Sequence, residues 1–451
     1  MVAIALPRPA AARAVVAAWE AGEAVLPLDP DAPAAELKGI LAAARPTHLL
    51  EDGEGRRRLP GGEPGEAGLA AVVATSGTSD APKVVELGAD AIRWSALATS
   101  AALAAGPGDR WLCCLPLHGV AGLAVVARAW HTGLPVEVHE RFAPAAVAEA
   151  AGRATLVSLV PAMLRRLLAA GDEAARFRRV LLGGGPIPPD LAAEAAHRGV
   201  TVVRTYGLTE TFGGMVHDGH PLEGAEVQIG GASLRGARVG DVRVGGLWTT
   251  GSPDPPAGLP SRTGGPATGE GWKSGAPQPT DPKPTHTEGE VLVRGPMLFR
   301  RYRGDPERTA AVLRDGWLST GDLGRIGPDG TLAVLGRVDD LVISGGVNIH
   351  PDEVEAALAT HPGVAEVAVA GRADAEWGQR VTAFVVPRDP ASPPTLDELR
   401  ALVRERLSPA KAPRELVLLS ALPRGPSGKL LRRLLPDGEA DVDAGPGRHL
   451  L

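Results

Sequence analysis

The chain has little of what marks an extracellular, membrane-embedded or nucleic-acid-binding protein. Its only two cysteines, Cys113 and Cys114, are adjacent and cannot pair with each other without strain, so a disulfide framework is excluded. No run of 18 uncharged apolar residues occurs, and charges interrupt the Ala-rich segment 1–28, so we expect neither a transmembrane helix nor a signal peptide. Lys and Arg (47) do not outnumber Asp and Glu (53), which leaves no basic surplus to attract nucleic acid. We therefore expect a cytoplasmic protein.

The hydrophobic pattern predicts an α/β fold. Ala-rich helical segments alternate with short apolar strands over the first 220 residues, which favours largely parallel sheets. Helices are expected at 10–20, 34–44, 91–104, 120–132, 144–151, 161–170 and 188–198. Strands are expected within 24–33 and at 69–75, 110–115, 134–139, 154–160, 178–182 and 200–204.

The pattern changes in the second half of the chain. Short alternating segments after residue 221 predict a small antiparallel sheet or distorted β-barrel, interrupted by a flexible Gly/Pro-rich insertion at 245–288. The elements expected after residue 340 are helices at 351–360 and 395–407 and strands at 364–370, 380–387 and 415–419. We thus expect a large N-terminal domain over 1–336, a hinge at 337–340, a small mobile α+β domain over 341–436 and a loose tail at 437–451.

Five short segments could carry chemistry. The first, TSGTSDAPK at 75–83, sets hydroxyls, a glycine and a lysine directly after an apolar strand, which suits a phosphate-binding loop but also an ordinary polar turn. It lacks the Gly-Lys-Ser/Thr ending of a Walker A loop, which argues against a P-loop kinase or GTPase. The others are LGGGP at 182–186, TYGLTET at 205–211, STGD at 319–322 with GRVDD at 336–340, and PRGPSGK at 423–429.

Individual side chains in these segments suit a nucleotide. Tyr206 could stack on a base, and Glu210, flanked by hydroxyls, could hold Mg²⁺. Asp322 could accept hydrogen bonds from both ribose hydroxyls, and Arg337 could bridge to ribose or phosphate. Taken alone, Lys429 would be no more than a solvated surface charge.

In this order, the segments resemble the motifs of the adenylate-forming superfamily of acyl-CoA synthetases, peptide-synthetase adenylation domains and luciferases. TSGTSDAPK, GGGPIPP, YGLTET, GEVLVRGPMLFRRY, GWLSTGD, GRVDDLVISGGVNIHPDEVE and GPSGK carry the resemblance, which covers roughly residues 20–435. It implies that ATP activates a carboxylic acid as an acyl-adenylate with release of pyrophosphate. A nucleophile such as the CoA thiol then displaces AMP.

The resemblance also implies roles for individual residues. The β- and γ-phosphates would be held by Thr75, Ser76, Gly77, Thr78 and Lys83. Adenine and ribose would be held by Gly183, Gly184, Gly185, Tyr206, Gly207, Asp322 and Arg337. Catalysis would involve Glu210 holding Mg²⁺, Thr209 contacting the α-phosphate, and Lys429 bridging the carboxylate and the α-phosphate.

CoA and the acid would occupy a second set of residues. The small domain would swing about Asp339 and bring Gly345 and Gly346 beside the pantetheine arm. DAEWGQRVTAFVV at 374–386 is similar to aryl-CoA ligases, in which the tryptophan matching Trp377 stacks on the CoA adenine; a packing role for Trp377 stays open.

Segments 112–133, 155–168 and 202–229 resemble o-succinylbenzoate–CoA ligases of menaquinone synthesis. In that resemblance Gly213 and Gly214 leave room for a ring-shaped acid. The pocket walls would be Ser158, Val160, Pro161, Thr205, Thr211, Gly213 and Gly214.

Two positions depart from the family pattern. Asp80 replaces a glycine of the phosphate loop, and Gly119 stands where many CoA ligases have a histidine that the adjacent His118 could partly replace. The leading interpretation is an acid–CoA ligase that uses ATP, Mg²⁺ and CoA on an aromatic or medium-sized acid. The alternatives are an adenylation enzyme that loads a carrier protein, a fatty-acyl-CoA ligase, and an ATP-binding pseudoenzyme. The oligomeric state is not indicated.

Overall fold

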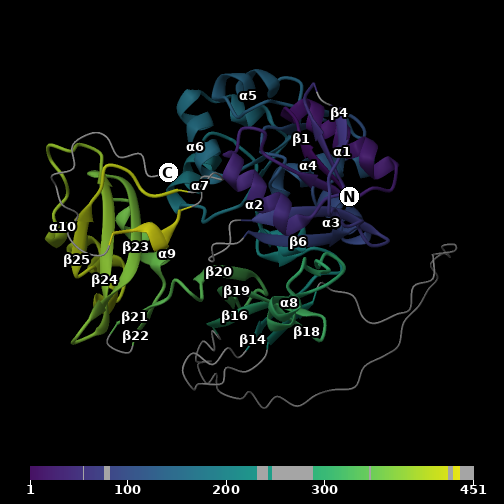
Figure 1. Ribbon diagram of the computed structural model, residues 1–451. Coiled ribbons are helices and arrows are strands. Elements are labelled where there is room, and N and C mark those ends of the chain that lie inside the picture. Colours follow the sequence, from purple (N-terminus) through teal and green to yellow (C-terminus); the bar gives the residue numbers. More distant parts are fainter. Residues whose placement is uncertain are drawn as a thin grey trace, which may run out of the picture.

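A computed structural model describes residues 1–53, 55–75, 82–230, 242–245, 288–344, 347–424 and 430–436. Figure 1 shows a large body of helices and sheets from the N-terminal half of the chain, a third sheet below it, and a small C-terminal unit beside them. Within the described residues, no helix is long and apolar enough to cross a bilayer.

The first sheet has seven strands in the order β17-β6-β5-β2-β1-β3-β4. They are β1 (Val2–Ala5), β2 (Val25–Pro27), β3 (His48–Glu51), β4 (Gly55–Arg58), β5 (Leu69–Thr75), β6 (Lys83–Gly88) and β17 (Arg301–Tyr302). Strand β1 is parallel to β2 and β3, and β2 to β5, whereas β4, β6 and β17 pair in the antiparallel sense. Helices α1 (Arg8–Glu20) and α2 (Ala34–Ala44) connect the first three strands.

The second sheet has the order β13-β12-β11-β10-β9-β7-β8. Its strands are β7 (Trp111–Cys113), β8 (Val136–Val138), β9 (Leu156–Leu159), β10 (Arg179–Leu182), β11 (Val202–Leu208), β12 (Gly213–His217) and β13 (His220–Pro221). The first five of these are parallel, and β12 and β13 are antiparallel additions at one edge. The helices are α3 (Ala89–Ala102), α4 (Val120–Thr132), α5 (Pro144–Ala150), α6 (Pro161–Ala170) and α7 (Pro189–His197), with 3-10 turns η1 (Glu173–Arg176) and η2 (Thr209–Thr211).

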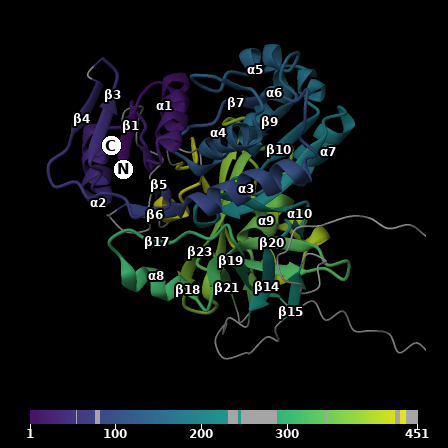
Figure 2. The same ribbon diagram turned by 90° about the vertical axis from the view of Figure 1, so that its right-hand side faces the viewer.

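One hydrophobic core joins the two sheets. It contains side chains of β1 and β5 from the first sheet, of β7 and β12 from the second, and of α1, α3 and α4 between them. Figure 2 shows α3 and α4 between the strands of the two sheets. Helix α4 is buried from Gly122 to Ala129, which explains why its sequence is apolar on every side.

The third sheet is antiparallel, as the alternating pattern predicted. Its strands are β14 (Glu226–Gly230), β15 (Val242–Gly245), β16 (Glu288–Arg294), β18 (Leu313–Arg314), β19 (Trp317–Ile326) and β20 (Leu332–Arg337). Helix α8 (Pro306–Val312) precedes β18, and its N-cap Asp305 accepts a hydrogen bond from the backbone of Arg308.

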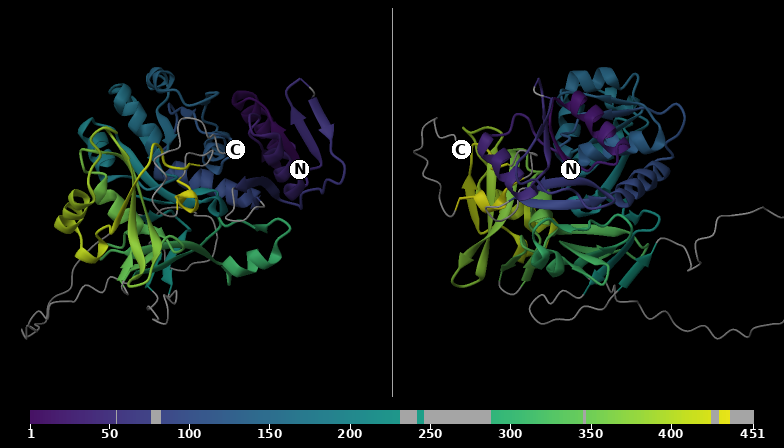
Figure 3. Two further views of the ribbon diagram at one scale, coloured as in Figure 1. Left: turned by 60° about the vertical axis from the view of Figure 1, so that its left-hand side comes forward. Right: turned by 45° about the vertical axis from the view of Figure 1, so that its right-hand side comes forward.

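The C-terminal unit is a five-stranded sheet with two helices. Strands β21 (Val342–Ser344), β22 (Val347–Ile349), β23 (Val364–Asp374), β24 (Gly378–Pro387) and β25 (Glu415–Leu418) form it. Helices α9 (Pro351–Leu358) and α10 (Leu396–Arg406) pack on its core, and 3-10 turns η3 (Pro409–Lys411) and η4 (Arg432–Leu434) follow. Figure 3 shows this unit next to the third sheet, where α9 contacts β20.

The predicted α/β class and the small α+β unit are confirmed, and α2, α4 and α6 have the predicted bounds. The predicted surface loop at 53–68 is partly wrong, because β4 pairs there with β3. All four β4 residues are exposed, so no apolar alternation marks the strand. Cys113 and Cys114 are free and buried, as expected for small hydrophobic side chains.

Candidate active site

The strands on either side of the predicted phosphate loop pair with each other. Strands β5 and β6 pair in antiparallel register, and Thr75 is directly opposite Lys83. Ser76, Gly77, Thr78 and the unusual Asp80 lie between them, outside the described residues. The register therefore places the lysine of the motif beside the threonine that begins it.

Lys83 contacts Glu210 from the third motif. Its Nζ lies 2.5 Å from Glu210 Oε1, and the Tyr302 hydroxyl donates to the same oxygen at 2.7 Å. Glu210 is only 7 % exposed. Burial raises the pKa of its carboxyl, but the charge of Lys83 and the hydrogen bonds from Lys83 and Tyr302 outweigh burial and lower that pKa overall. Glu210 is therefore a carboxylate at neutral pH.

A lone buried carboxylate fits Mg²⁺ that arrives with a nucleotide. The described residues contain no group of three His, Cys, Asp or Glu that could hold a metal ion by themselves. Mg²⁺ in nucleotide sites is bound by one or two carboxylates, with phosphate oxygens and waters completing its shell. Thr209 precedes Glu210 in the η2 turn.

Three of the residues predicted at adenine and ribose meet in one hydrogen-bonded group. Tyr206 donates its hydroxyl to Asp322 Oδ2 at 2.7 Å, and Arg337 Nη1 donates to Asp322 Oδ1 at 2.8 Å. The β19–β20 register sets Asp322 opposite Arg337. Burial, and next the charge of Asp322, raise the pKa of Tyr206 well above its usual value, so the phenol stays protonated.

Substituting Asp322 with Asn is expected to raise the KM for ATP about 10- to 100-fold. The amide cannot accept charge-assisted hydrogen bonds, each of which contributes about 1.5–3 kcal/mol. Tyr206→Phe, which keeps the carboxylate, is the matched control and is expected to show a smaller effect. ATP titration of acid-dependent pyrophosphate release measures both; an unchanged KM in Asp322→Asn would contradict the ribose role.

The glycines of the second and third motifs allow close backbone packing. A Cβ on Gly183 would lie 2.6 Å from Thr205 Cγ2, and one on Gly207 would lie 1.8 Å from the carbonyl oxygen of Gly213. Gly184 has a φ of +81°, and a Cβ there would lie 3.2 Å from Val160 Cγ1, whereas Gly185 faces open space. Packing within the protein therefore requires Gly183 and Gly207 before any ligand is considered.

Four of the predicted acyl-pocket residues lie on strands β9, β11 and β12 of the second sheet. Ser158 lies on β9, Thr205 on β11, and Gly213 and Gly214 on β12. Val160 is the N-cap of α6, which begins at Pro161. Thr211 is fully buried, and its hydroxyl donates to the Gly213 carbonyl at 2.8 Å and accepts from the Leu208 amide at 2.8 Å, so that hydroxyl is committed to the η2 turn.

Arg128 is a buried cation that the motif analysis missed. It is 4 % exposed, donates from Nη2 to Ser158 Oγ at 2.9 Å, and lies with Cζ 4.5 Å from the centre of the Trp111 ring. Among the described residues no carboxylate pairs with Arg128, and its Nε has no hydrogen-bond partner. Burial lowers the pKa of Arg128 to about 10, so it remains charged at neutral pH. The sequence feature that could have revealed Arg128 is that it is the only charged residue in the apolar segment VAGLAVVARAW.

His217 lies close to Arg128 and was also missed. Its position on β12 is opposite Thr205 on β11. It is 7 % exposed, and neither of its ring nitrogens has a partner in the part of the chain that the structure describes. Burial, and next the charge of Arg128, lower the pKa of His217 to about 4, so its imidazole is neutral at pH 7.

His118 lies beside the start of α4. Its Nδ1 is 3.9 Å from Asp29 Oδ2, and burial lowers the pKa of its imidazole more than Asp29 raises it. Gly119 is the N-cap of α4, and a Cβ there would meet only the Pro116 carbonyl at 3.8 Å. Local packing therefore leaves room for a larger side chain at position 119.

The predicted CoA residues are only partly described. Trp377 is half-buried, and Arg414 stacks on it with Cζ 3.8 Å from the ring centre, which favours a packing role for that face. Asp339, the predicted hinge residue, is exposed between β20 and β21. Gly345, Gly346 and Lys429 lie outside the described residues.

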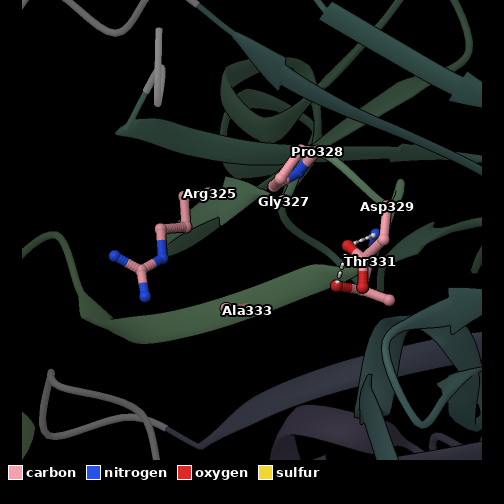
Figure 4. A pocket seen from close by; sticks show the side chains of 6 residues that line it. All are labelled: Arg325, Gly327, Pro328, Asp329, Thr331 and Ala333. Carbon is pink, nitrogen blue, oxygen red and sulfur yellow. Dashed lines mark hydrogen bonds between the residues drawn. The ribbon is translucent and has the colours of Figure 1, made fainter. Parts of the chain in front are cut away.

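Two surface depressions lie away from the motif residues. The depression in Figure 4, about 400 Å³, surrounds the β19–β20 turn, where Asp329 accepts hydrogen bonds from the amide and hydroxyl of Thr331. The other, about 500 Å³, includes Asp29, Arg8 and Glu140. Neither contains a predicted nucleotide or acyl-pocket residue.

Comparisons with known proteins identify the family of the chain. Residues 1–303 match the AMP-binding enzyme family, and residues 353–429 match the AMP-binding enzyme C-terminal domain. The 2-succinylbenzoate–CoA ligase of Geobacillus kaustophilus is 37 % identical over 375 residues, covering 81 % of this chain and 69 % of that enzyme.

Two solved structures of one enzyme are also similar. The o-succinylbenzoate CoA synthetase of Bacillus subtilis, in complex with the acyl-adenylate intermediate, has a TM-score of 0.77 at 29 % identity over 97 % of this chain and 88 % of that one. The same enzyme in complex with ATP and magnesium ion has a TM-score of 0.76 at 29 % identity over 96 % of this chain and 88 % of that one. The chain belongs to the AMP-binding enzyme family, as the order of its motifs predicted.

Proposed function

We propose that the chain is an ATP-dependent ligase that joins 2-succinylbenzoate to CoA through an acyl-adenylate. The reaction class is that named for its relatives, and the contacts of Tyr206 with Asp322, of Asp322 with Arg337 and of Lys83 with Glu210 support it. ATP, Mg²⁺ and CoA are the co-reactants of this reaction. The choice of acid within the class rests on the pocket itself.

Arg128 is the observation that supports this acid. Burying a cation without an anion partner costs free energy, and a bound carboxylate would offset that cost. 2-Succinylbenzoate has two carboxylates, of which one reacts and the other keeps its charge. Benzoates and fatty acids have only the carboxylate that reacts. An arginine that donates to Ser158 and has no carboxylate partner therefore favours the dicarboxylic acid.

In the first half-reaction the acid oxygen attacks the α-phosphorus and pyrophosphate leaves. Lys83 and Lys429 would supply fixed positive charge to the phosphoryl oxygens, where negative charge develops. Glu210 would hold Mg²⁺, which neutralises phosphate charge when bound. Tyr206, Asp322 and Arg337 would orient the nucleoside. Such contacts lower the barrier because they hold the α-phosphate in a fixed position relative to the attacking acid.

In the second half-reaction the CoA sulfur attacks the acyl carbon and AMP leaves. The small domain would move at the predicted hinge, 337–340, and would bring Gly345 and Gly346 to the pantetheine arm and Trp377 to the CoA adenine. The described residues offer no feature that favours a carrier protein over CoA.

Acid-dependent thioester formation tests the proposed function. Purified protein would receive ATP, Mg²⁺ and CoA with 2-succinylbenzoate, benzoate or a medium-chain fatty acid, and acyl-CoA would be measured by mass spectrometry. We expect thioester from 2-succinylbenzoate, lost in Lys429→Ala. Thioester only from benzoate or the fatty acid would refute the choice of acid. Pyrophosphate release without thioester would point to a carrier protein, and ATP binding without either product would point to a pseudoenzyme.

A further inference from the structure

A largely buried arginine joins three parts of the C-terminal unit. Arg432 begins the η4 turn, and its side chain is 14 % exposed. Its Nη2 donates to Asp352 Oδ1 at 2.6 Å, and its Nη1 lies 2.9 Å from Glu355 Oε1. Its Nε lies 3.4 Å from Asp340 Oδ2. Asp352 and Glu355 belong to α9, whereas Asp340 lies between β20 and β21, so three separate segments meet at one guanidinium.

The charges of this group favour one fixed arrangement. Burial lowers the pKa of Arg432, but Glu355 and Asp352 outweigh burial and raise that pKa overall, so Arg432 is a cation at neutral pH. Burial raises the pKa of Glu355 to about 7, although the charge of Arg432 acts in the opposite sense. A planar guanidinium can donate to two carboxylates at once in a rigid geometry, which a lysine ammonium does not reproduce. Arg432 therefore attaches the η4 turn to α9.

The place of Arg432 in the sequence connects this attachment to Lys429. Arg432 is the first charged residue after Lys429 and follows it by three positions. Lys429 itself lies outside the described residues. Arg424 and Leu430, which flank the segment 425–429, form an antiparallel β-bridge. The chain is thus held on both sides of this segment, and its attachment to α9 begins within three residues of the lysine.

The contact with Asp340 suggests a different role for the same side chain. Asp340 directly follows Asp339, the predicted hinge residue, so Arg432 could fix the hinge instead. A role at the hinge would affect both half-reactions, because the small domain takes part in both. The contacts with α9, at 2.6 Å and 2.9 Å, are shorter than the 3.4 Å contact with Asp340. These distances favour the attachment of η4 to α9 as the main role.

We propose that Arg432 is a positioning residue for the first half-reaction, which holds the segment after Lys429 against α9 so that the lysine meets the α-phosphate in one fixed geometry. This inference rests on the proposed function. Arg432 acts through Lys429 and does not touch the substrate. Fixed geometry matters because a displacement of about 1 Å can cost about 10²-fold in rate. The second half-reaction, for which no role of Lys429 is proposed, should depend far less on the same attachment.

The test measures the two half-reactions separately. ATP–pyrophosphate exchange with 2-succinylbenzoate measures adenylation, and thioester formation from synthetic 2-succinylbenzoyl-adenylate and CoA measures the second half-reaction without ATP. We expect Arg432→Met to lower the exchange rate about 10- to 100-fold, while thioester formation stays within about threefold of the wild-type rate. Lys429→Ala should divide the two half-reactions in the same way, with a larger loss in the first.

Two further variants separate positioning from folding. Arg432→Lys keeps a cation beside the carboxylates but does not hold Asp352 and Glu355 together, so it should fold and lose part of the exchange activity. Arg433→Met is the matched control, because Arg433 is the exposed neighbour of Arg432 and the change removes the same charge. It should leave both half-reactions unchanged. Melting temperatures of all the variants check that each one folds.

Three results would overturn the inference. Equal losses in both half-reactions for Arg432→Met and Arg432→Lys would show a structural role. Losses in both half-reactions for Asp340→Asn, as large as those of Arg432→Met, would assign Arg432 to the hinge. A wild-type exchange rate in Arg432→Met would show that Arg432 has no role in adenylation. If the wild-type protein itself catalyses no exchange with 2-succinylbenzoate, the proposed function fails, whatever the variants show.

Discussion

Arg128→Met is expected to lower kcat/KM for 2-succinylbenzoate about 10²- to 10³-fold. Removing one partner of a buried, hydrogen-bonded charge pair costs about 2–5 kcal/mol, much of it from the charge left unpaired. Here the charge left behind would be the non-reacting carboxylate of the acid. Steady-state thioester formation measures the effect with the diacid and with a matched monoacid, which is whichever of 4-oxo-4-phenylbutanoate and 2-butanoylbenzoate the protein activates. The monoacid should lose far less.

The same substitution is expected to leave the melting temperature unchanged or higher. In the free protein Arg128 has no carboxylate partner among the described residues and donates only to Ser158, and methionine fills a similar volume without a charge to desolvate. A variant with lost activity and undiminished stability would identify Arg128 as a binding residue whose burial is unfavourable until the acid binds.

Arg303→Met is the matched control for a buried arginine. Its side chain is 9 % exposed and pairs with Glu86 at 2.5 Å in the first sheet. Removing it should lower the melting temperature because Glu86 loses a buried partner, yet the preference for the diacid should not change. Equal losses for both acids in Arg128→Met, or a large fall in its melting temperature, would contradict the assignment.

Glu210→Gln is expected to lower acid-dependent pyrophosphate release about 10²- to 10³-fold, the size of effect seen when one preorganised electrostatic group is removed. The neutral amide cannot balance Lys83, which lies 2.5 Å from the carboxylate oxygen, and it is a weaker Mg²⁺ ligand. The Mg²⁺ concentration needed for half-maximal rate should rise as well. Pyrophosphate release measured across a Mg²⁺ titration checks both effects.

Tyr302→Phe provides the comparison at the same oxygen. It removes the 2.7 Å hydrogen bond to Glu210 but keeps the carboxylate, so its effect should be tenfold or less. A Glu210→Gln variant with near wild-type rates and unchanged Mg²⁺ dependence would show that Glu210 serves only to pair with Lys83.

Most of the fold could be predicted because burial leaves a periodic pattern. Helices α2, α4 and α6 begin and end at the predicted residues, and the alternating segments form the third sheet. Strand β4 has no buried residue and therefore no pattern. Strand β6 was not predicted, because it begins at Lys83, the last residue of the predicted phosphate-binding motif. It pairs with β5 in the antiparallel sense, which helps to make the first sheet mixed.

The proximity of the residues that we propose at the nucleotide could be predicted from the order of the motifs. Tyr206, Asp322 and Arg337 do meet, although the first two are 116 positions apart. Arg128 and His217 could not be predicted in the same way. Periodicity shows that a position is buried, but only three-dimensional contacts show that a buried polar atom has no partner. The contact of Arg414 with Trp377 had no local sequence signal either.

The most direct test is the preference of the wild-type protein between 2-succinylbenzoate and its matched monoacid. Both acids would be supplied together with ATP, Mg²⁺ and CoA, and the two thioesters would be quantified by mass spectrometry as initial rates. The account predicts that 2-succinylbenzoyl-CoA forms at least about 10²-fold faster, because only the diacid pairs with Arg128. Comparable rates for the two acids would contradict it.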